Sequence, residues 1–339
     1  MQSNFDQMKS VVRYMRSSLA RALRGCGMRG REIAADAAVG RHAPCWLHEA
    51  KSKGPRPVVF EIHGGGFALG DARKEDALRE WIRDSFDVHV VGLDYRLAPE
   101  NPAPAALDDV VASIRMIASG SQCDVDASRL VLLGYSAGAS LALAAAFELA
   151  RDAEVHLAGL ALHYPFLDAA TAPDEDAVRD IDLPLDLMQA FNEWYIADGD
   201  AHDPRISPAF ATDAQIASLP FVGFYPVEGD ELFAQAEAMA ARMKALDRPA
   251  GWHPISGMYH GYIEDAANVA VYEAISLPET VAARPCGYVR AAAHNVKASL
   301  EEILGPAPHD IEFDGGRRDA HDEMDPGRDS VRLGSGCGH

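Results

Sequence analysis

The sequence predicts an α/β fold, in which a mostly parallel central sheet is covered by helices on both faces. Two observations carry this prediction. Short apolar runs alternate with longer helical segments along the chain, and glycine-rich turns follow two of those runs directly. With 339 residues and 48% hydrophobic content, the chain is long enough to bury one large core and to carry an added helical cap.

The expected elements follow from the apolar runs and from the helix-forming composition between them. Strands are expected near residues 41–49, 58–62, 88–93, 130–134, 156–163, 219–225 and 250–255. Helices are expected near residues 74–84, 103–119, 139–151, 232–246, 262–275 and 291–304. Because helices join the strands, the sheet is expected to be parallel, with its ligand-binding loops at the carboxyl ends of the strands.

Three segments depart from this alternation. Residues 1–40 are predicted to be N-terminal cap helices, and the main domain, 41–304, is predicted to contain a cap insertion at about 168–215. A helix expected at 184–197 within this insertion carries aromatic and aliphatic side chains, which either line a pocket or simply seat the helix on the core. Residues 305–339 contain few apolar residues and are predicted to be a disordered tail.

One sequence motif indicates a nucleophile. Residues 134–138 read Gly-Tyr-Ser-Ala-Gly and follow the apolar run 130–133 directly. This arrangement predicts a strand, a sharp turn with Ser136 at its apex, and a helix whose positive dipole end points at the serine. Gly134 and Gly138 lie where the strand and the helix crowd that turn. The motif is short, however, and it also fits an ordinary strand-to-helix turn.

A second glycine-rich turn, His-Gly-Gly-Gly at residues 63–66, follows the apolar run 58–62. Three consecutive glycines cost conformational entropy, and close approach of the backbone to a ligand is one reason for them. Their N–H groups could stabilise the oxyanion that forms when a serine attacks a carbonyl group, so the two motifs together indicate acyl transfer. A flexible loop is the alternative interpretation. His63 is expected to brace the loop rather than to titrate in catalysis.

A serine nucleophile needs a general base, and the 13 histidines have to be separated by position. In α/β-hydrolases, whose nucleophile motif this turn resembles, the chain order is serine, then aspartate or glutamate, then histidine, with the acid and the base on loops after later strands. The acidic run 228–231 follows one late strand, and His260 lies in a glycine-flanked loop after the last strand. His260 is therefore the expected base and Asp230 the expected orienting acid, with Glu228 and Glu231 as alternatives for the acid.

The other histidines are weaker candidates for the general base. His163 ends a strand and is a candidate for lining the pocket, whereas His253 lies within a strand and is expected to be packed or on the surface. Solvent exposure is expected for His309, His321 and His339.

Taken together, these motifs resemble those of the hormone-sensitive-lipase-type esterases, a group within the α/β-hydrolase superfamily. The matching segments are 63–67, 94–100 with Pro104, 134–138, 207–208, 230–232 and 257–261. The resemblance covers about residues 40–275. It implies an α/β-hydrolase fold with a helical cap, and a serine carboxylesterase that acts through an acyl-enzyme intermediate. The site residues that it implies are Ser136 as nucleophile, Asp230 as acid, His260 as base, and the N–H groups of Gly65, Gly66 and Ala137 as the oxyanion hole.

The sequence departs from the family pattern at three positions near these residues. Such esterases usually carry aspartate before the nucleophile, a second glycine after the motif and proline after the acid; here those positions are Tyr135, Ala139 and Glu231. None of these changes removes a reacting group, but they leave the pocket shape and the substrate preference open. A lactonase, amidase or acyltransferase with the same three catalytic residues is therefore an alternative, and a non-catalytic ligand-binding protein is another.

Composition excludes several classes of partner. The formal net charge of −20 disfavours nucleic acids and anionic membrane surfaces, and no apolar run reaches the length of a membrane span. The five cysteines are scattered without metal-site spacing, which favours reduced thiols in the cytoplasm. Residues 8–23 are basic and amphipathic, so a targeting helix is the alternative to a cap helix there. The expected partner is a small ester substrate, with no metal or organic cofactor, and a homodimer stays open.

Overall fold

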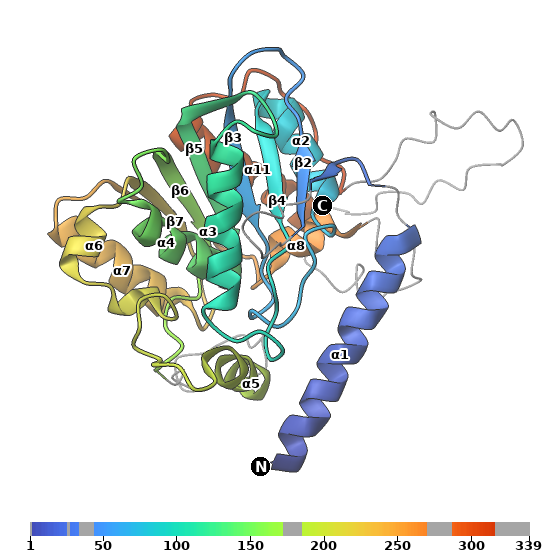
Figure 1. Ribbon diagram of the computed structural model, residues 1–339, viewed down its shortest axis with the longest axis vertical. Coiled ribbons are helices and arrows are strands. Elements are labelled where there is room, and N and C mark those ends of the chain that lie inside the picture. Colours follow the sequence, from blue (N-terminus) through green and yellow to red (C-terminus); the bar gives the residue numbers. More distant parts are fainter. Residues whose placement is uncertain (1, 26–27, 34–43, 172–184, 270–286, 316–339) are drawn as a thin grey trace, which may run out of the picture.

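The computed structural model describes residues 2–25, 28–33, 44–171, 185–269 and 287–315. At its centre lies an eight-stranded sheet with helices on both faces (Figure 1). In chain order the elements are α1 (Gln2–Gly25), β1 (Arg31–Ile33), β2 (Cys45–His48), β3 (Arg56–Ile62), α2 (Asp76–Phe86), β4 (His89–Leu93), α3 (Ala105–Ala118), β5 (Val125–Tyr135), α4 (Ala137–Leu149), β6 (Leu157–His163), α5 (Leu185–Ile196), the 3₁₀ turn η2 (Pro208–Phe210), α6 (Asp213–Ala217), β7 (Phe221–Tyr225), α7 (Phe233–Ala245), β8 (Ala250–Trp252), α8 (Tyr262–Ala267) and α11 (Tyr288–Leu304).

The strands lie in the order β1-β2-β4-β3-β5-β6-β7-β8. Every neighbouring pair from β4 to β8 is parallel, whereas β2 pairs antiparallel with both β1 and β4. The predicted α/β fold with a mostly parallel sheet is therefore confirmed. Since the strands from β4 to β8 share one direction, the loops that follow β3, β5, β7 and β8 all leave from the same end of the sheet.

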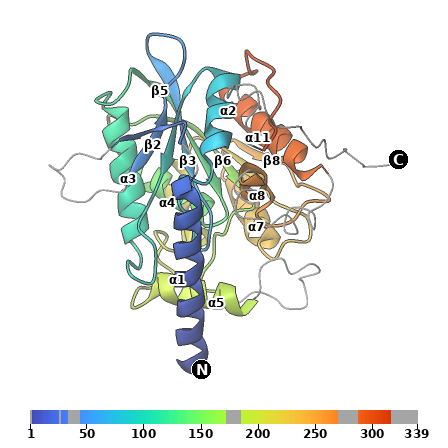
Figure 2. The same cartoon turned by 90° about the vertical axis from the view of Figure 1, so that its right-hand side faces the viewer.

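The sheet separates two hydrophobic cores, because alternate side chains of a strand point to opposite faces. In β3, Val58, Phe60 and Ile62 pack in the core that includes α3 and α4, whereas Val59 packs in the core that includes α2, α8 and α11. Figure 2 shows α3 on one side of the sheet and α2 and α11 on the other. Residue 61, the next position on the second face, is a glutamate.

This second core buries charged side chains. Glu61 and Arg79 of α2 are both 0% exposed, and Arg79 Nη1 lies 2.8 Å from Glu61 Oε2. Glu75 is also 0% exposed, and neither of its carboxylate oxygens accepts a hydrogen bond from the described residues. Burial raises the pKa of Glu75 to about 8; Lys74 and Arg79 oppose this shift and Glu61 adds to it. The Glu75 carboxyl group is therefore protonated at neutral pH.

Two terminal segments differ from the predictions. Residues 31–33, within the predicted N-terminal cap, form β1 at the edge of the sheet, and a three-residue strand has too little pattern to be recognised from sequence. Residues 305–315, within the predicted disordered tail, pack on the body. Phe313 is buried against Trp81, whose Nε1 donates to the Ile311 carbonyl oxygen at 2.7 Å. The rest of that prediction, residues 316–339, lies outside the described residues.

The remaining differences concern the ends of elements. β5 begins at Val125 rather than near Leu130, and β8 ends at Trp252, followed by an isolated bridge between Val227 and Ile255. The helix predicted at 262–275 is described as α8 up to Ala267, and its last predicted residues, from 270 on, lie outside the described residues.

Two helices lie outside the layers around the sheet. α5, predicted at 184–197, lies beyond one end of the sheet and next to α1 (Figures 1 and 2). α1 is held through Arg16, whose Nε donates to the Ala68 carbonyl oxygen at 2.6 Å and whose Nη1 lies 2.7 Å from Glu100 Oε2. Ala68 lies two residues after the glycine-rich loop at 63–66, so α1 contacts the segment beside that loop. No described helix combines the length and the apolar character that crossing a membrane requires.

Glu75→Gln should make the protein more tolerant of alkaline pH. The pKa of Glu75 is raised from its ordinary 4.5 to about 8, so the unfolded chain loses this proton first and the wild type loses stability as the pH rises from about 4.5 to about 8. Glutamine keeps the shape but cannot ionise. The free energy of unfolding of the variant, relative to wild type, should therefore be higher at pH 8 than at pH 5, measured by urea denaturation.

The matched control is Glu154→Gln, the same substitution at an exposed position. The difference in free energy of unfolding between Glu154→Gln and wild type should be the same at pH 5 and pH 8. If Glu75→Gln behaves like this control, the raised pKa of Glu75 is wrong.

Candidate active site

Ser136 lies at the turn between β5 and α4 with φ 50° and ψ −118°, a strained conformation for a residue with a side chain. Close backbone contacts hold the turn on both sides. A Cβ atom on Gly134 would lie 2.6 Å from the Gly138 carbonyl oxygen, and one on Gly138 would lie 2.0 Å from the Ile62 carbonyl oxygen. Both positions therefore require glycine, which is the geometric basis of the Gly-x-Ser-x-Gly spacing.

The loop after β3 is braced by His63. Its ring is buried and stacks on Tyr95 with 4.2 Å between centroids, and its Nδ1–H donates to the Gly64 carbonyl oxygen at 2.8 Å. The Tyr95 hydroxyl group in turn donates to the His63 carbonyl oxygen at 2.9 Å. Burial lowers the pKa of His63 to about 4, so its ring is neutral. These contacts agree with the expectation that His63 supports the loop and does not titrate in catalysis.

The expected oxyanion donors lie around Ser136. Gly65 and Gly66 have φ values of +112° and +58°, which only glycine adopts without strain, and both line the same cavity as Ser136 and Ala137. Among the described residues, the N–H groups of Gly65, Gly66 and Ala137 do not donate to a backbone carbonyl oxygen. They are therefore available to a ligand in the cavity.

Ser136, His260 and Asp230 form one hydrogen-bonded chain. His260 Nδ1 lies 2.8 Å from Asp230 Oδ2, and His260 Nε2 lies 2.9 Å from Ser136 Oγ. A carboxylate only accepts, so Nδ1–H donates to Asp230, and in the neutral ring Nε2 accepts the hydroxyl proton of Ser136. Asp230 is further held by the Leu232 N–H, 3.0 Å from its Oδ1.

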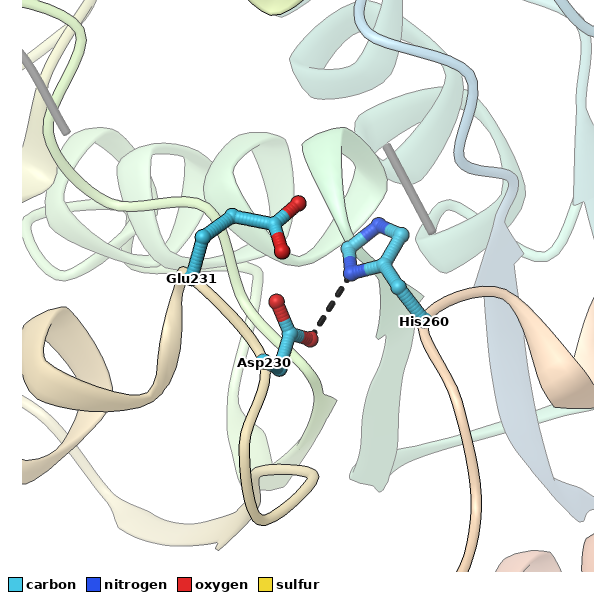
Figure 3. A group of neighbouring side chains, drawn as sticks. All are labelled: Asp230, Glu231 and His260. Atoms are coloured by element: carbon cyan, nitrogen blue, oxygen red, sulfur yellow. Dashed lines mark hydrogen bonds and ion pairs between the residues drawn. The ribbon is translucent and has the colours of Figure 1, made fainter. Parts of the chain in front are cut away.

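The two alternative acids lie in different surroundings. Glu228 is exposed, and its Oε2 accepts a hydrogen bond from the Ser256 hydroxyl group at 2.5 Å. Glu231, by contrast, lies beside the bonded pair of Asp230 and His260 (Figure 3). The geometry thus places Asp230, and neither of the two glutamates, in the hydrogen bond to the imidazole ring.

The surroundings of His260 favour its charged form. Burial lowers the pKa of His260, but the charge of Asp230 and the hydrogen bond to it outweigh burial, with Glu231 and Glu264 adding to their effect. The net result raises the pKa to about 9. An imidazole in this position is a strong base, because the neighbouring carboxylates stabilise the imidazolium ion that forms when it accepts a proton.

A cavity of about 260 Å³ opens beside Ser136. The glycine-rich loop and the turn at Ser136 form one side, and apolar side chains form the other. These apolar side chains are Phe166, Leu187, Met188, Phe191 and Leu232. Its size lies just below the range of about 300–1,000 Å³ that holds drug-sized ligands, which suits a small substrate.

The structure supports both interpretations of α5. Leu187, Met188 and Phe191 line the cavity, so part of the helix does contribute to the pocket. Tyr195 instead stacks on Phe67 with 3.7 Å between ring centroids and is buried in the core. α5 therefore both lines the pocket and seats itself on the body.

Two aromatic or imidazole side chains near the site have packing roles. His163 is fully buried, with Nε2 3.2 Å from Ser299 Oγ, and does not line the cavity, so the pocket role considered for it is not seen. Tyr135, beside Ser136, is also fully buried, and its ring contacts those of His163 and Tyr164.

Sequence reasoning missed Glu264, which lines the cavity four positions after His260. The Tyr164 hydroxyl group donates to Glu264, and the edge of the Tyr164 ring faces His260 with 5.1 Å between centroids. A Cβ atom on Gly64 would lie 2.4 Å from Glu264 Oε1, so the carboxyl group packs directly on the glycine-rich loop. No motif marks this contact; the available signal is the position of Glu264 in the first turn of the helix that follows His260.

Asp230, Glu231 and His260 are also close enough to suggest metal ligands, with one candidate atom from each within 4.8 Å of the others. Both ring nitrogens of His260 already lie in hydrogen bonds, to Asp230 and to Ser136. We therefore interpret the group as a hydrogen-bonded network and not as a metal centre.

Comparisons with known proteins agree with this fold. Residues 59–264 match the family model described as the α/β hydrolase fold. The esterase LipI of Mycobacterium tuberculosis is 32% identical over 228 residues, which cover 64% of this chain and 69% of that protein. An arylesterase of Saccharolobus solfataricus is 31% identical over 214 residues, covering 61% and 68% of the two chains. The crystal structure of a thermostable esterase from Pseudomonas putida superposes with a TM-score of 0.71 at 24% identity and covers 88% of this chain and 92% of that one.

Gly138→Ala should disrupt the turn at Ser136. The added methyl group would meet the Ile62 carbonyl oxygen at 2.0 Å, and because backbone must move to relieve this clash, we expect a loss of about 1–3 kcal/mol in stability together with most of the activity. Gly54→Ala is the control: nothing lies within 4 Å of the added atom, and its φ of +91°, unlike the φ of Gly138, is positive, so this variant carries backbone strain without a clash. Thermal unfolding and initial rates of both variants test this; equal losses would contradict the proposed crowding at Gly138.

Proposed function

The chain belongs to the α/β-hydrolase family, and on that basis we propose that it is a serine carboxylesterase, which hydrolyses small carboxylic esters through an acyl-enzyme intermediate. The observation that carries the proposal is the chain of hydrogen bonds from Ser136 through His260 to Asp230, 2.9 and 2.8 Å long, beside three available N–H groups. A protein that only binds ligands has no need of this arrangement. The relatives named above are esterases, which favours ester hydrolysis over the lactonase, amidase and acyltransferase alternatives.

In the proposed mechanism His260 Nε2 takes the proton of Ser136 as Oγ attacks the ester carbonyl carbon. The N–H groups of Gly65, Gly66 and Ala137 stabilise the oxyanion, with the N-terminus of α4 adding its dipole. The imidazolium ion then gives its proton to the leaving alcohol, which leaves an acyl group on Ser136. Water, deprotonated by His260, releases the acid in a second passage through the same steps. Asp230 holds the ring orientation and stabilises the imidazolium ion throughout.

We also propose that the chain belongs to the hormone-sensitive-lipase-type group, with α1 and the insertion at 168–215, which contains α5, as its cap. The His-Gly-Gly-Gly loop and the lining of the cavity by α5 support this assignment. A cytoplasmic location is part of the proposal, and it rests on the scattered cysteines, since neither Cys45 nor Cys123 forms a disulfide. Cell fractionation would test it.

Ser136→Ala should abolish hydrolysis of p-nitrophenyl esters and leave the fold intact. Loss of a serine nucleophile removes the covalent route and costs about a millionfold in kcat in well-studied serine hydrolases. Ser218→Ala, at an exposed serine, is the control and should keep full activity. Initial rates and labelling by a fluorophosphonate would be measured for both. Turnover that persists in Ser136→Ala would rule out this serine as the nucleophile.

The cavity predicts a preference for short acyl chains. Along a p-nitrophenyl series, kcat/KM should be highest for the acetyl to butyryl esters, because a volume of about 260 Å³ has to hold both parts of the substrate. Phe191→Ala removes a ring from the cavity wall and should raise the relative kcat/KM of longer chains by about tenfold. Phe233→Ala, on α7, is the control because the Phe233 side chain does not line the cavity. An unchanged profile in Phe191→Ala would show that this wall does not select the acyl chain.

A further inference from the structure

Glu231 places a second carboxyl group beside the expected triad. Both of its carboxylate oxygens are shielded from solvent, and neither accepts a hydrogen bond from the described residues. One oxygen of Glu231, one of Asp230 and one ring nitrogen of His260 all lie within 4.8 Å of one another. In Figure 3 the two carboxyl groups both turn toward the same imidazole ring. This position is one of those at which the sequence departs from the family pattern, which has proline there.

Few other charges face this group. Asp230 and Glu231 come from the loop after β7, Glu264 approaches from α8, and the turn after β5 contributes the neutral hydroxyl group of Ser136. The end of β6 contributes Tyr164, whose ring edge faces His260. Lys74 also lines the cavity, and its charge acts on Glu264. His260 is the titratable cation that the three carboxyl groups surround.

We propose that Glu231 is a positioning residue of the catalytic site, whose negative charge strengthens His260 as the general base. The inference rests on the proposed serine-esterase function and deepens it. In this role Glu231 never touches the substrate. It acts through the imidazole ring, in the same sense as Asp230 but without a hydrogen bond from the ring.

The order of the two titrations supports this role. Burial and the charge of Asp230 raise the pKa of Glu231 to about 7, against the attraction of His260, whose own pKa is about 9. As the pH rises, Glu231 therefore loses its proton before His260 does. Between these two values the site holds a Glu231 carboxylate beside a His260 imidazolium ion, and the ring cannot act as a base until it loses that proton.

Two opposite kinetic effects follow from removing the charge. Without the carboxylate the imidazolium ion is less stable, so the neutral base becomes available at lower pH. The same weaker base takes the serine proton less well in the transition state, so the rate at the alkaline plateau falls. A residue that only fills space would lower the plateau and leave the pH dependence in place.

The test is the pH profile of kcat/KM for p-nitrophenyl acetate with Glu231→Gln, which keeps the size and shape of the side chain. We expect the acidic limb to move to lower pH by about one unit, because a unit charge within 5 Å of the ring is removed from a partly buried site. The plateau should fall several-fold. Glu237→Gln, at an exposed position on α7, removes the same charge without facing His260 and should leave the limb in place.

The proposal is overturned if the acidic limb of Glu231→Gln lies within about 0.3 pH unit of the wild-type limb. It is also overturned if the acidic limb of the Glu237→Gln control shifts by as much as that of Glu231→Gln. Because Glu231→Gln could fail to fold, Glu231→Asp is a second variant. It keeps the charge and should keep the acidic limb of wild type; a limb that moves as far as in Glu231→Gln would argue against a charge effect.

The failure of this inference can be separated from a failure of the proposed esterase function. If no ester is hydrolysed, the rate at which a fluorophosphonate labels Ser136 can be followed against pH instead, since that reaction uses the same base and nucleophile. A shift of its acidic limb in Glu231→Gln supports the role of Glu231 even without ester turnover. If ester hydrolysis depends on Ser136 but the acidic limb does not shift in either assay, the esterase function is supported and the role of Glu231 is rejected.

Discussion

The site depends on one close contact between two backbones, where the start of α4 meets the end of β3. A Cβ atom at Gly138 would lie 2.0 Å from the Ile62 carbonyl oxygen and 2.4 Å from that of His63. Only glycine allows this approach, and it brings the turn at Ser136 against the glycine-rich loop. The Ala137 N–H, at the first turn of α4, and those of Gly65 and Gly66 consequently border one cavity. A looser contact would separate the proposed nucleophile from its proposed oxyanion donors, and catalytic rates are sensitive to displacements of about 1 Å.

Next to this contact the protein buries several ionisable side chains, which is energetically unfavourable. The glycine-rich loop packs on Glu264, and the same core holds Glu61, Glu75 and Arg79 at 0 to 9% exposure. An isolated buried ion is destabilising because it loses its hydration, and two features of this core reduce that destabilisation. Glu61 pairs with Arg79, and Glu75 stays protonated. Since the charge of Glu264 acts on both Glu75 and His260, the protonation of this core and that of His260 are electrostatically linked.

Local backbone constraints explain which parts of the structure could be predicted from sequence. Alternating apolar runs were enough for the strands from β2 to β8 and the helices between them, though not for the short β1. The glycine motifs located the turn at Ser136 because their spacing follows from close backbone contacts at that turn. The positions of Asp230 and His260 followed from chain order. By contrast, the burial of Glu75, the approach of Glu264 to Gly64 and the anchoring of residues 305–315 by Phe313 arise from packing between distant segments. Such contacts leave no periodic or motif signal in a single sequence.

Substrate selection also depends on packing between distant segments, because α5 contacts the glycine-rich loop as well as the cavity. Phe191 lines the cavity and also covers Gly66, where an added Cβ atom would lie 2.1 Å from its ring. One turn further along the helix, Tyr195 stacks on Phe67, the residue after that glycine. The helix that shapes the pocket therefore also supports the backbone that presents the N–H groups. Substrate preference and transition-state stabilisation are then not independent in this fold, and changes in α5 that widen the pocket should alter kcat as well as KM.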